Sequence, residues 1–180
     1  MFTLPSELKL KYDKDYIDDV ISKMAVEMNS FFTNEKFLNE EILILAVLTG
    51  ALYFAADLTR KLNFNAEVGS IKASSYINNK QEGDVKVQGN GANVKDKVVI
   101  LLDDICDTGH TFEILSKNMK ELGAKEVYCA SLLLKQENTY FIPNFSGIVY
   151  KGDDWFVGYG MDDSQKYRHL SSIYTKKKVY

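Results

Sequence analysis

The chain has 180 residues, the size of one typical domain with some embellishment. A hydrophobic fraction of 46% and a charged fraction of 26% are those of an ordinary soluble globular protein and exclude a disordered chain. The net charge of −3 produces no overall field that attracts nucleic acid or anionic lipid. The two cysteines lack CxxC spacing, and the longest apolar run, residues 42–48, is too short to cross a membrane. We therefore expect a cytoplasmic protein with neither a membrane nor a nucleic-acid partner.

The first half of the chain alternates helix-like and strand-like patterns. Apolar residues at helical spacing predict a helix over about 13–30, which Asp13 or Asp15 caps. Residues 41–48 form a continuous apolar run, which is typical of a strand buried on both faces of a parallel sheet. A helix over about 52–63 and a strand over 67–76 follow.

A long polar segment separates this half from the next. It spans residues 78–93, contains three glycines and has only a short strand-like piece around 85–87. Because it is too long for a plain connector, we expect a mobile functional loop.

The second half repeats the alternation. A buried strand over 98–102, a helix over about 111–122 that Gly123 stops, and a strand over 127–134 follow in order. Strand–helix–strand units of this length predict right-handed crossovers and therefore an α/β fold with a mostly parallel central sheet flanked by helices. The aromatic-rich segment 147–180 is less regular, and we expect it to pack over the carboxyl edge of the sheet.

The most informative segment follows the strand that begins at Val98. The apolar strand ends in two carboxylates, Asp103 and Asp104, and a short turn then leads into a helix. Ligands of open α/β sheets bind beyond the carboxyl ends of the strands, and backbone amides at a helix start favour a phosphate. Gly109 permits close approach of the main chain, while Thr108 and Thr111 add hydroxyl donors. Solvated turn residues and a simple helix cap are the alternative for each residue alone, but the array as a whole favours a phosphate site.

The segment Asp103-Asp-Ile-Cys-Asp-Thr-Gly-His-Thr111 resembles the phosphoribosyl-pyrophosphate (PRPP) motif of type I phosphoribosyltransferases. Four further stretches resemble the hypoxanthine(-guanine) branch of that family: the pyrophosphate loop, the start of the lid, the strand with a purine-contacting lysine, and the hood. They are residues 47–58, 72–76, 130–135, and 155–162 together with 166–170. The resemblance therefore covers most of the chain and implies the type I phosphoribosyltransferase fold in a single domain, residues 1–180, with a flexible lid at about 74–93 and a small C-terminal hood at about 147–180.

The resemblance also implies roles for the ribose and phosphate side of the site. Asp103 and Asp104 would hold the ribose hydroxyls directly or through Mg²⁺, the implied cofactor. The 5′-phosphate would be bound by the turn of Asp107, Thr108, Gly109, His110 and Thr111. Pyrophosphate would be bound by Thr49, Gly50 and Arg168, and Ser75 and Tyr76 would belong to the lid.

On the purine side, Asp107 would face the base as general acid or base, and Lys135 would donate to the 6-oxo group. Trp155 would stack on the base, while the main chain around Phe156 and Asp162 would read its edge. Asp162 would also bind a second Mg²⁺ through water.

Each of these residues also has a plainer interpretation. Lys135 could be a surface lysine, Trp155 plain core and Arg168 half of a surface ion pair. Asp162 could belong to a solvated turn. His110 and His169 are poor candidates for catalysis or metal binding, since the family tolerates many residues at the position of His110.

Two positions depart from the family pattern. Thr49 stands where the family often has a lysine or arginine, and Asp103 stands where it commonly has glutamate. The family also has a cis peptide at the position of Leu48–Thr49.

The implied activity is Mg²⁺-dependent transfer of the 5-phosphoribosyl group from PRPP to N9 of a 6-oxopurine in purine salvage, with hypoxanthine as first choice and guanine as second. The partners are PRPP and a purine base, and the family suggests a homodimer or homotetramer. A Rossmann dehydrogenase is excluded because its glycine motif is absent, and the absence of a P-loop motif disfavours a nucleotidase. The remaining alternative is a regulatory protein of the same fold that senses PRPP and binds nucleic acid, but the chain lacks both an added helix-turn-helix length and excess positive charge.

Overall fold

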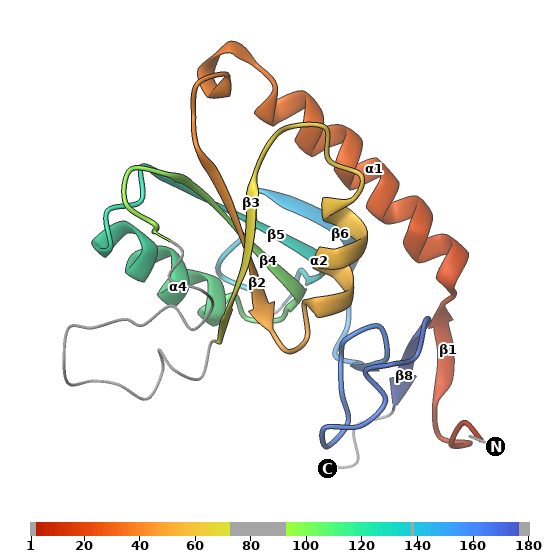
Figure 1. Ribbon diagram of the computed structural model, residues 1–180. Coiled ribbons are helices and arrows are strands. Elements are labelled where there is room, and N and C mark those ends of the chain that lie inside the picture. Colours follow the sequence, from red (N-terminus) through yellow and green to blue (C-terminus); the bar gives the residue numbers. More distant parts are fainter. Residues whose placement is uncertain (1–2, 73–92, 138, 177–180) are drawn as a thin grey trace.

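The computed structural model describes residues 3–72, 93–137 and 139–176. Its core is a five-stranded sheet in the order β3-β2-β4-β5-β6, in which every neighbouring pair is parallel (Figure 1). The strands are β2 (Ile42–Leu48), β3 (Glu67–Lys72), β4 (Val98–Cys106), β5 (Glu126–Lys135) and β6 (Phe145–Tyr150). The predicted α/β class with a parallel central sheet is confirmed.

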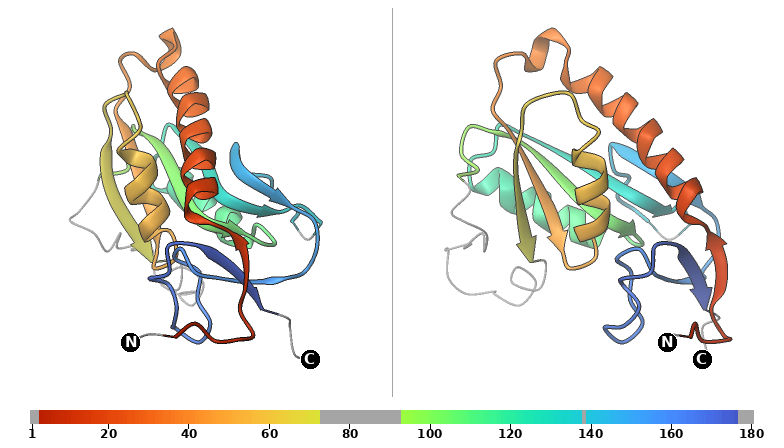
Figure 2. Two further views of the ribbon diagram at one scale, coloured as in Figure 1. Left: turned by 90° about the vertical axis from the view of Figure 1, so that its right-hand side faces the viewer. Right: turned by 45° about the vertical axis from the view of Figure 1, so that its right-hand side comes forward.

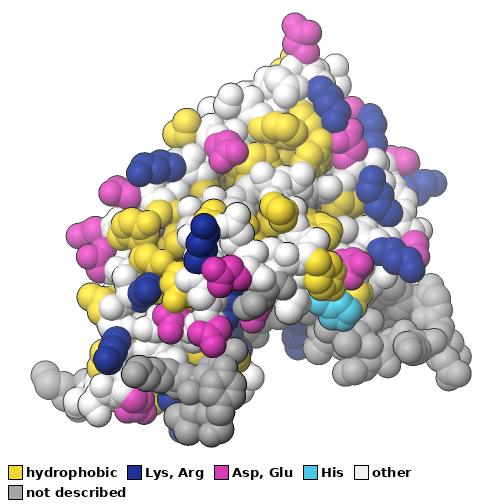
Figure 3. Space-filling view, turned by 180° about the vertical axis from the view of Figure 1, so that it is seen from behind, with side chains coloured by type: hydrophobic (Ala, Val, Ile, Leu, Met, Phe, Trp, Pro, Cys, Tyr) yellow, Lys and Arg dark blue, Asp and Glu magenta, His cyan; other side chains and the backbone are white. Residues whose placement is uncertain are grey.

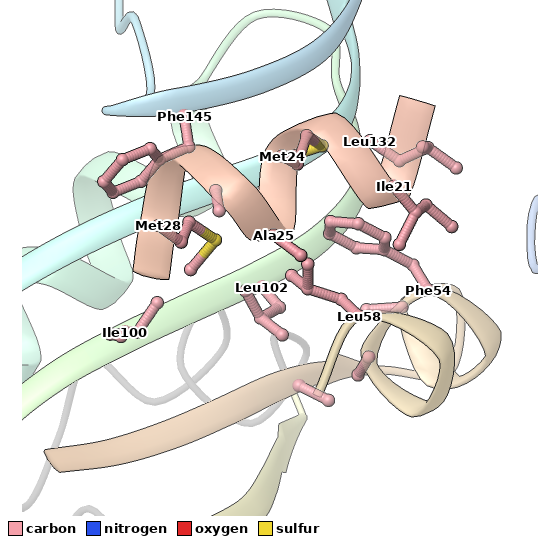
Figure 4. Packing of buried hydrophobic residues seen from close by; sticks show 14 of the residues in the cluster. Ile21, Met24, Ala25, Met28, Phe54, Leu58, Ile100, Leu102, Leu132 and Phe145 are labelled. Atoms are coloured by element: carbon pink, nitrogen blue, oxygen red, sulfur yellow. The ribbon is translucent and has the colours of Figure 1, made fainter. Parts of the chain in front are cut away.

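Helices cover both faces of this sheet. Helix α1 (Lys14–Phe32), the short 3₁₀ helix η1 (Glu35–Phe37) and helix α2 (Leu52–Thr59) lie on one side, and α4 (His110–Glu121) lies on the other. Figure 4 shows Met24 and Met28 of α1 in one cluster with Phe54 of α2 and with Ile100 and Leu102 of β4. Burial of these two apolar layers is the main force that holds the sheet and its carboxyl edge in place.

The predicted elements recur with shifted boundaries. Asp13 caps α1 as expected, with its carboxylate accepting the Tyr16 backbone N–H at 2.8 Å. Helix α2 ends at Thr59 rather than 63, and β3 is described only to Lys72. The strand-like piece around 85–87 and the lid at about 74–93, with Ser75 and Tyr76, lie outside the described residues.

Strand β4 corrects the prediction in a way that matters for the site. The strand does not stop at residue 102 but continues to Cys106, so the two aspartates lie within it. The reason is the neighbouring strand: β4 and β5 stay paired from Val98↔Glu126 to Cys106↔Leu134. Tertiary pairing thus extends the strand past the point at which the apolar run ends.

The C-terminal segment is more regular than the sequence indicated. Its first residues, 147–150, belong to β6, which joins the main sheet. β7 (Trp155–Val157) and β8 (Ile173–Lys176) form a small antiparallel sheet with β1 (Lys9–Tyr12). The views in Figure 2 show this small sheet beyond the carboxyl ends of the main strands, with the N-terminal β1 beside β8. In the described part of the chain, no helix combines the length and the apolar character needed to cross a membrane.

Candidate active site at the carboxyl edge of the sheet

The carboxyl ends of β2, β4 and β5 face the hood across a cavity of about 280 Å³. Its lining brings together most of the residues that the sequence indicated, and these are Gly50, Asp103, Asp104, Asp107, Lys135, Trp155, Phe156, Asp162 and Arg168. A second cavity of about 260 Å³ is lined by residues 103–112 and shares the aspartates with the first. Residues more than 100 positions apart in the chain therefore meet at one edge of the sheet.

Asp103 and Asp104 form the acidic edge where the two cavities meet. Both residues are buried, and each carboxylate accepts a hydrogen bond at 3.0 Å from the backbone N–H of the following residue. Burial raises the pKa of both carboxyls. The neighbouring Asp104 charge raises the pKa of Asp103 further, whereas the Arg168 charge opposes the rise at Asp104. Two adjacent buried carboxylates of this kind are suited to hold a cation or hydroxyl groups.

The turn after β4 has the geometry of an anion site. Gly109 adopts a left-handed φ of 87°, and α4 begins at the next residue, so the first amides of the helix are free of intrahelical partners. Phe141 packs closely against this turn, because a Cβ added at Gly109 would lie only 2.5 Å from the Cβ of Phe141. The Tyr140 backbone N–H also donates to the Thr108 carbonyl at 3.1 Å. His110, Thr108 and Thr111 all line the smaller cavity.

Lys135 is buried, which rules out the surface-lysine interpretation. Only 2% of its side chain is exposed, and its Nζ lies 3.5 Å from Oδ2 of Asp107 and 5.8 Å from the centre of the Phe156 ring. The last residue of β5 therefore presents a cation to the cavity, opposite an aromatic ring and beside a carboxylate.

The hood contributes the opposite wall. Trp155 is 44% exposed, so it is not plain core, and its indole N–H donates to the Asp162 carbonyl at 3.2 Å. The Asp162 carboxylate pairs with Arg168 at 2.6 Å and accepts the Gln165 backbone N–H at 2.7 Å. Arg168 also donates to the Gly160 carbonyl at 2.6 Å. The Asp162–Arg168 pair is thus a half-buried contact that faces the cavity, and neither the solvated turn nor the ordinary surface ion pair describes it.

The loop after β2 closes the remaining side. Its Leu48–Thr49 peptide is cis. Gly50 lies against the acidic edge, since a Cβ there would be 2.3 Å from Oδ2 of Asp104. The Thr49 side chain is exposed and is absent from the lining of the larger cavity, while Leu48 and Gly50 line it.

Sequence reasoning missed four apolar residues of the lining, which are Val47, Leu48, Ile105 and Met161. Val47 and Leu48 belong to β2 and Ile105 belongs to β4, so their apolar side chains indicated core packing rather than a binding site. The available indication was that all four lie inside the stretches 47–58, 103–111 and 155–162, which resemble segments of the family's site.

The fold and the site together define a class. The parallel sheet ends in two buried carboxylates and an amide-rich turn at a helix start, and a cation with aromatic rings faces them. This arrangement is that of an α/β protein that binds a phosphorylated ligand next to a flat, polar one.

Comparison with known proteins specifies the class. Residues 14–164 match the family model of the phosphoribosyl transferase domain. The chain is 29% identical over 177 residues to a hypoxanthine-guanine-xanthine phosphoribosyltransferase of Tritrichomonas foetus, covering 96% of this chain and 93% of that protein. It is 30% identical over 186 residues to the hypoxanthine-guanine phosphoribosyltransferase of Cricetulus griseus, covering 96% and 85%. A crystal structure of a hypoxanthine-guanine phosphoribosyltransferase from Bacillus anthracis superposes with a TM-score of 0.77 at 28% identity, covering 93% of this chain and 98% of that one.

The chain belongs to the phosphoribosyltransferase family, in the branch of the hypoxanthine-guanine enzymes. The resemblance that the sequence indicated is confirmed, and with it the transferase class. Nothing in the comparisons favours the nucleic-acid-binding alternative. On the face seen in Figure 3, Lys and Arg side chains are interspersed with Asp and Glu rather than gathered into a basic patch.

Proposed function

We propose that the protein transfers the 5-phosphoribosyl group of PRPP to N9 of a 6-oxopurine, with hypoxanthine preferred and guanine second. The products are a nucleoside monophosphate and pyrophosphate. The observation that carries this proposal is the buried Lys135 ammonium, which lies 3.5 Å from Asp107 in the same cavity as Asp103 and Asp104. A buried cation beside an aromatic ring suits the carbonyl oxygen of a flat base, and the acidic edge next to it suits the sugar.

The turn of residues 107–111 binds the 5′-phosphate in this proposal. Amides at the start of α4 and the hydroxyls of Thr108 and Thr111 supply donors, and the helix dipole favours the negative charge. His110 lines the same cavity. Asp103 and Asp104 accept hydrogen bonds from the ribose 2′ and 3′ hydroxyls.

The residues present fit Mg²⁺ as the cofactor. Among the described residues, no group of three or more His, Cys, Asp or Glu side chains forms a protein-only metal site. Mg²⁺ commonly binds one or two carboxylates together with substrate phosphates and waters, and Asp103 and Asp104 offer two adjacent carboxylates at the cavity. Asp162, on the facing wall, is the candidate for a second ion through water. When bound, Mg²⁺ supplies charge neutralisation at the pyrophosphate oxygens.

The purine lies between Trp155 and Lys135. Lys135 donates to the 6-oxo group, and the main chain at Phe156 and Asp162 contacts the edge of the base. As N9 forms its bond to C1 of the ribose, the bond from C1 to pyrophosphate breaks and the electron pair leaves with pyrophosphate. Asp107 accepts the proton released from N7, so charge is balanced across the transfer.

The leaving pyrophosphate contacts the loop amides at Thr49 and Gly50 and the guanidinium of Arg168. Thr49 brings no positive charge, so Arg168 is the principal side-chain cation there. The lid with Ser75 and Tyr76 excludes water from the cation-like ribose as the bond breaks. The lid, the homodimer or homotetramer and the cytoplasmic location stay predictions.

The test mixes protein, Mg²⁺ and PRPP with hypoxanthine, guanine, xanthine or adenine and follows nucleotide formation by absorbance. We expect turnover with hypoxanthine, its loss with a chelator, and its loss in Asp107→Asn with an unchanged circular dichroism spectrum. Absence of turnover with every purine would overturn the proposal. A gel-shift assay with mixed DNA and RNA oligonucleotides tests the regulatory alternative in parallel.

A further inference from the structure

A partly buried hydrogen bond joins the hood to α2. Tyr159 is 5% exposed, and its hydroxyl donates to Oδ2 of Asp57 at 2.5 Å. Its ring also lies 6.3 Å from the Tyr53 ring of the same helix, and Asp57 pairs in addition with Arg60. Burial and the bond to Asp57 raise the pKa of Tyr159, so its hydroxyl stays a donor at neutral pH.

The residues that follow Tyr159 contact both ends of the proposed site. Gly160 has a φ of 99°, and a Cβ there would lie 2.0 Å from the Gly50 carbonyl oxygen, so the two backbones are in direct contact. The Gly160 backbone N–H donates to the Arg168 carbonyl at 3.0 Å, and its own carbonyl accepts from the Arg168 side chain. Met161, the next residue, lines the cavity.

The position of the 158–161 turn therefore controls two surfaces at once. One is the hood wall, with Met161 and Asp162, that faces the purine. The other is the surface of the Gly50 loop and Arg168, which the hood contacts and which faces pyrophosphate in the proposed function. Tyr159 does not line either cavity of the site, so its hydroxyl acts on ligands only through its neighbours.

We propose that Tyr159 and Asp57 are a positioning pair that sets the hood against the pyrophosphate loop, so that purine and pyrophosphate binding depend on the same hydrogen bond. The inference rests on the proposed function. The 5′-phosphate turn provides an internal reference, because its cavity is lined only by residues 103–112 and includes no residue of the hood.

The test uses Tyr159→Phe, which keeps the ring and the backbone conformation and removes the hydroxyl. We expect the KM of hypoxanthine, and that of pyrophosphate in the reverse reaction, each to rise about tenfold, the effect of losing a hydrogen bond to a charged group. The Kd of ribose 5-phosphate, measured by calorimetry, should stay within about twofold. Calorimetric Kd values of inosine monophosphate and pyrophosphate give the same comparison without turnover.

Three further variants make the test specific. Asp57→Ala removes the acceptor and should reproduce the effect of Tyr159→Phe, whereas Asp57→Asn retains an oxygen acceptor and should restore most of the affinity. Tyr128→Phe is the matched control, since the Tyr128 hydroxyl donates to Glu126 at 2.5 Å at the opposite end of the sheet. It should leave all three ligand affinities unchanged.

Unchanged affinity for purine and pyrophosphate in Tyr159→Phe overturns the inference. So does an equal loss for ribose 5-phosphate with a fall in Tm, because that result indicates a general structural role. Failure of the proposed function has a different signature, namely no turnover and no purine or pyrophosphate binding by the unmodified protein.

Discussion

Gly50 is the position where a single methyl group should disable the acidic edge. In Gly50→Ala, the added Cβ would lie 2.3 Å from Oδ2 and 2.6 Å from Cγ of Asp104, far inside van der Waals contact. Asp104 has little room to yield, because it is 6% exposed and its Oδ1 accepts the Ile105 N–H at 3.0 Å. Overpacking of this kind costs about 1–3 kcal/mol, which corresponds to a loss of about 5- to 150-fold in kcat/KM if the displaced carboxylate is needed in the transition state.

The assay is kcat/KM for PRPP at several Mg²⁺ concentrations, with Tm measured in parallel. We expect a lower kcat/KM, a weaker dependence on Mg²⁺ and a fall in Tm of about 2–4 °C per kcal/mol. Gly69→Ala in β3 is the control, because its Cβ would lie 3.2 Å from the end of the flexible Leu45 side chain of β2, and Gly69 does not line the cavity. Wild-type kcat/KM and Mg²⁺ dependence in Gly50→Ala would refute the assignment of Asp104 to the site.

Three further changes test the other parts of the site. Lys135→Met should raise the KM of hypoxanthine about 10- to 100-fold while leaving the urea midpoint unchanged or higher, because burial of a charge costs free energy; an unaltered KM would contradict its role. Burial raises the pKa of Asp103 in the folded protein, so this carboxyl loses its proton at a lower pH in the unfolded chain than in the folded one. The free energy of unfolding therefore falls by about 1.4 kcal/mol per pH unit as pH rises from the ordinary pKa to the raised one. Asp103→Asn should therefore raise Tm at pH 7 but not at pH 3 and should reduce turnover; a lower Tm at pH 7 would show that the carboxylate stabilises the fold. Gly109→Ala, which places a Cβ 2.5 Å from Phe141 at a φ of 87°, should weaken ribose 5-phosphate binding at least about tenfold by calorimetry, and intact binding would remove the turn from the phosphate site.

The predictions of the fold that the structure confirms came from local sequence patterns. The helix over about 13–30 and the buried strands follow from apolar periodicity and from a continuous apolar run, which depend on neighbours in sequence. The segment of residues 103–111 was recognisable for the same reason, since its carboxylates, glycine and hydroxyls are contiguous. Comparison with known proteins bears out the family to which that segment pointed.

Local sequence patterns could not predict where the strands end or which distant residues contact one another. Strand β4 continues through Asp103 and Asp104 because β5 pairs with it, and the short β6 forms because β5 offers an edge. Lys135 reads as a surface residue by type, yet it is buried against Asp107 and Phe156, which come from other elements.

The order of residues alone determined the α/β class, the motif of residues 103–111 that is proposed to bind phosphate, and the set of polar residues available for chemistry, because each depends on residues within a few positions of one another. Only the folded chain decided which of those residues face one cavity, that Trp155 is exposed to it while Thr49 is not, and that Gly50 contacts both Asp104 and Gly160. The reason is that packing and strand pairing join segments distant in sequence, and the free energy of those contacts is absent from any local pattern.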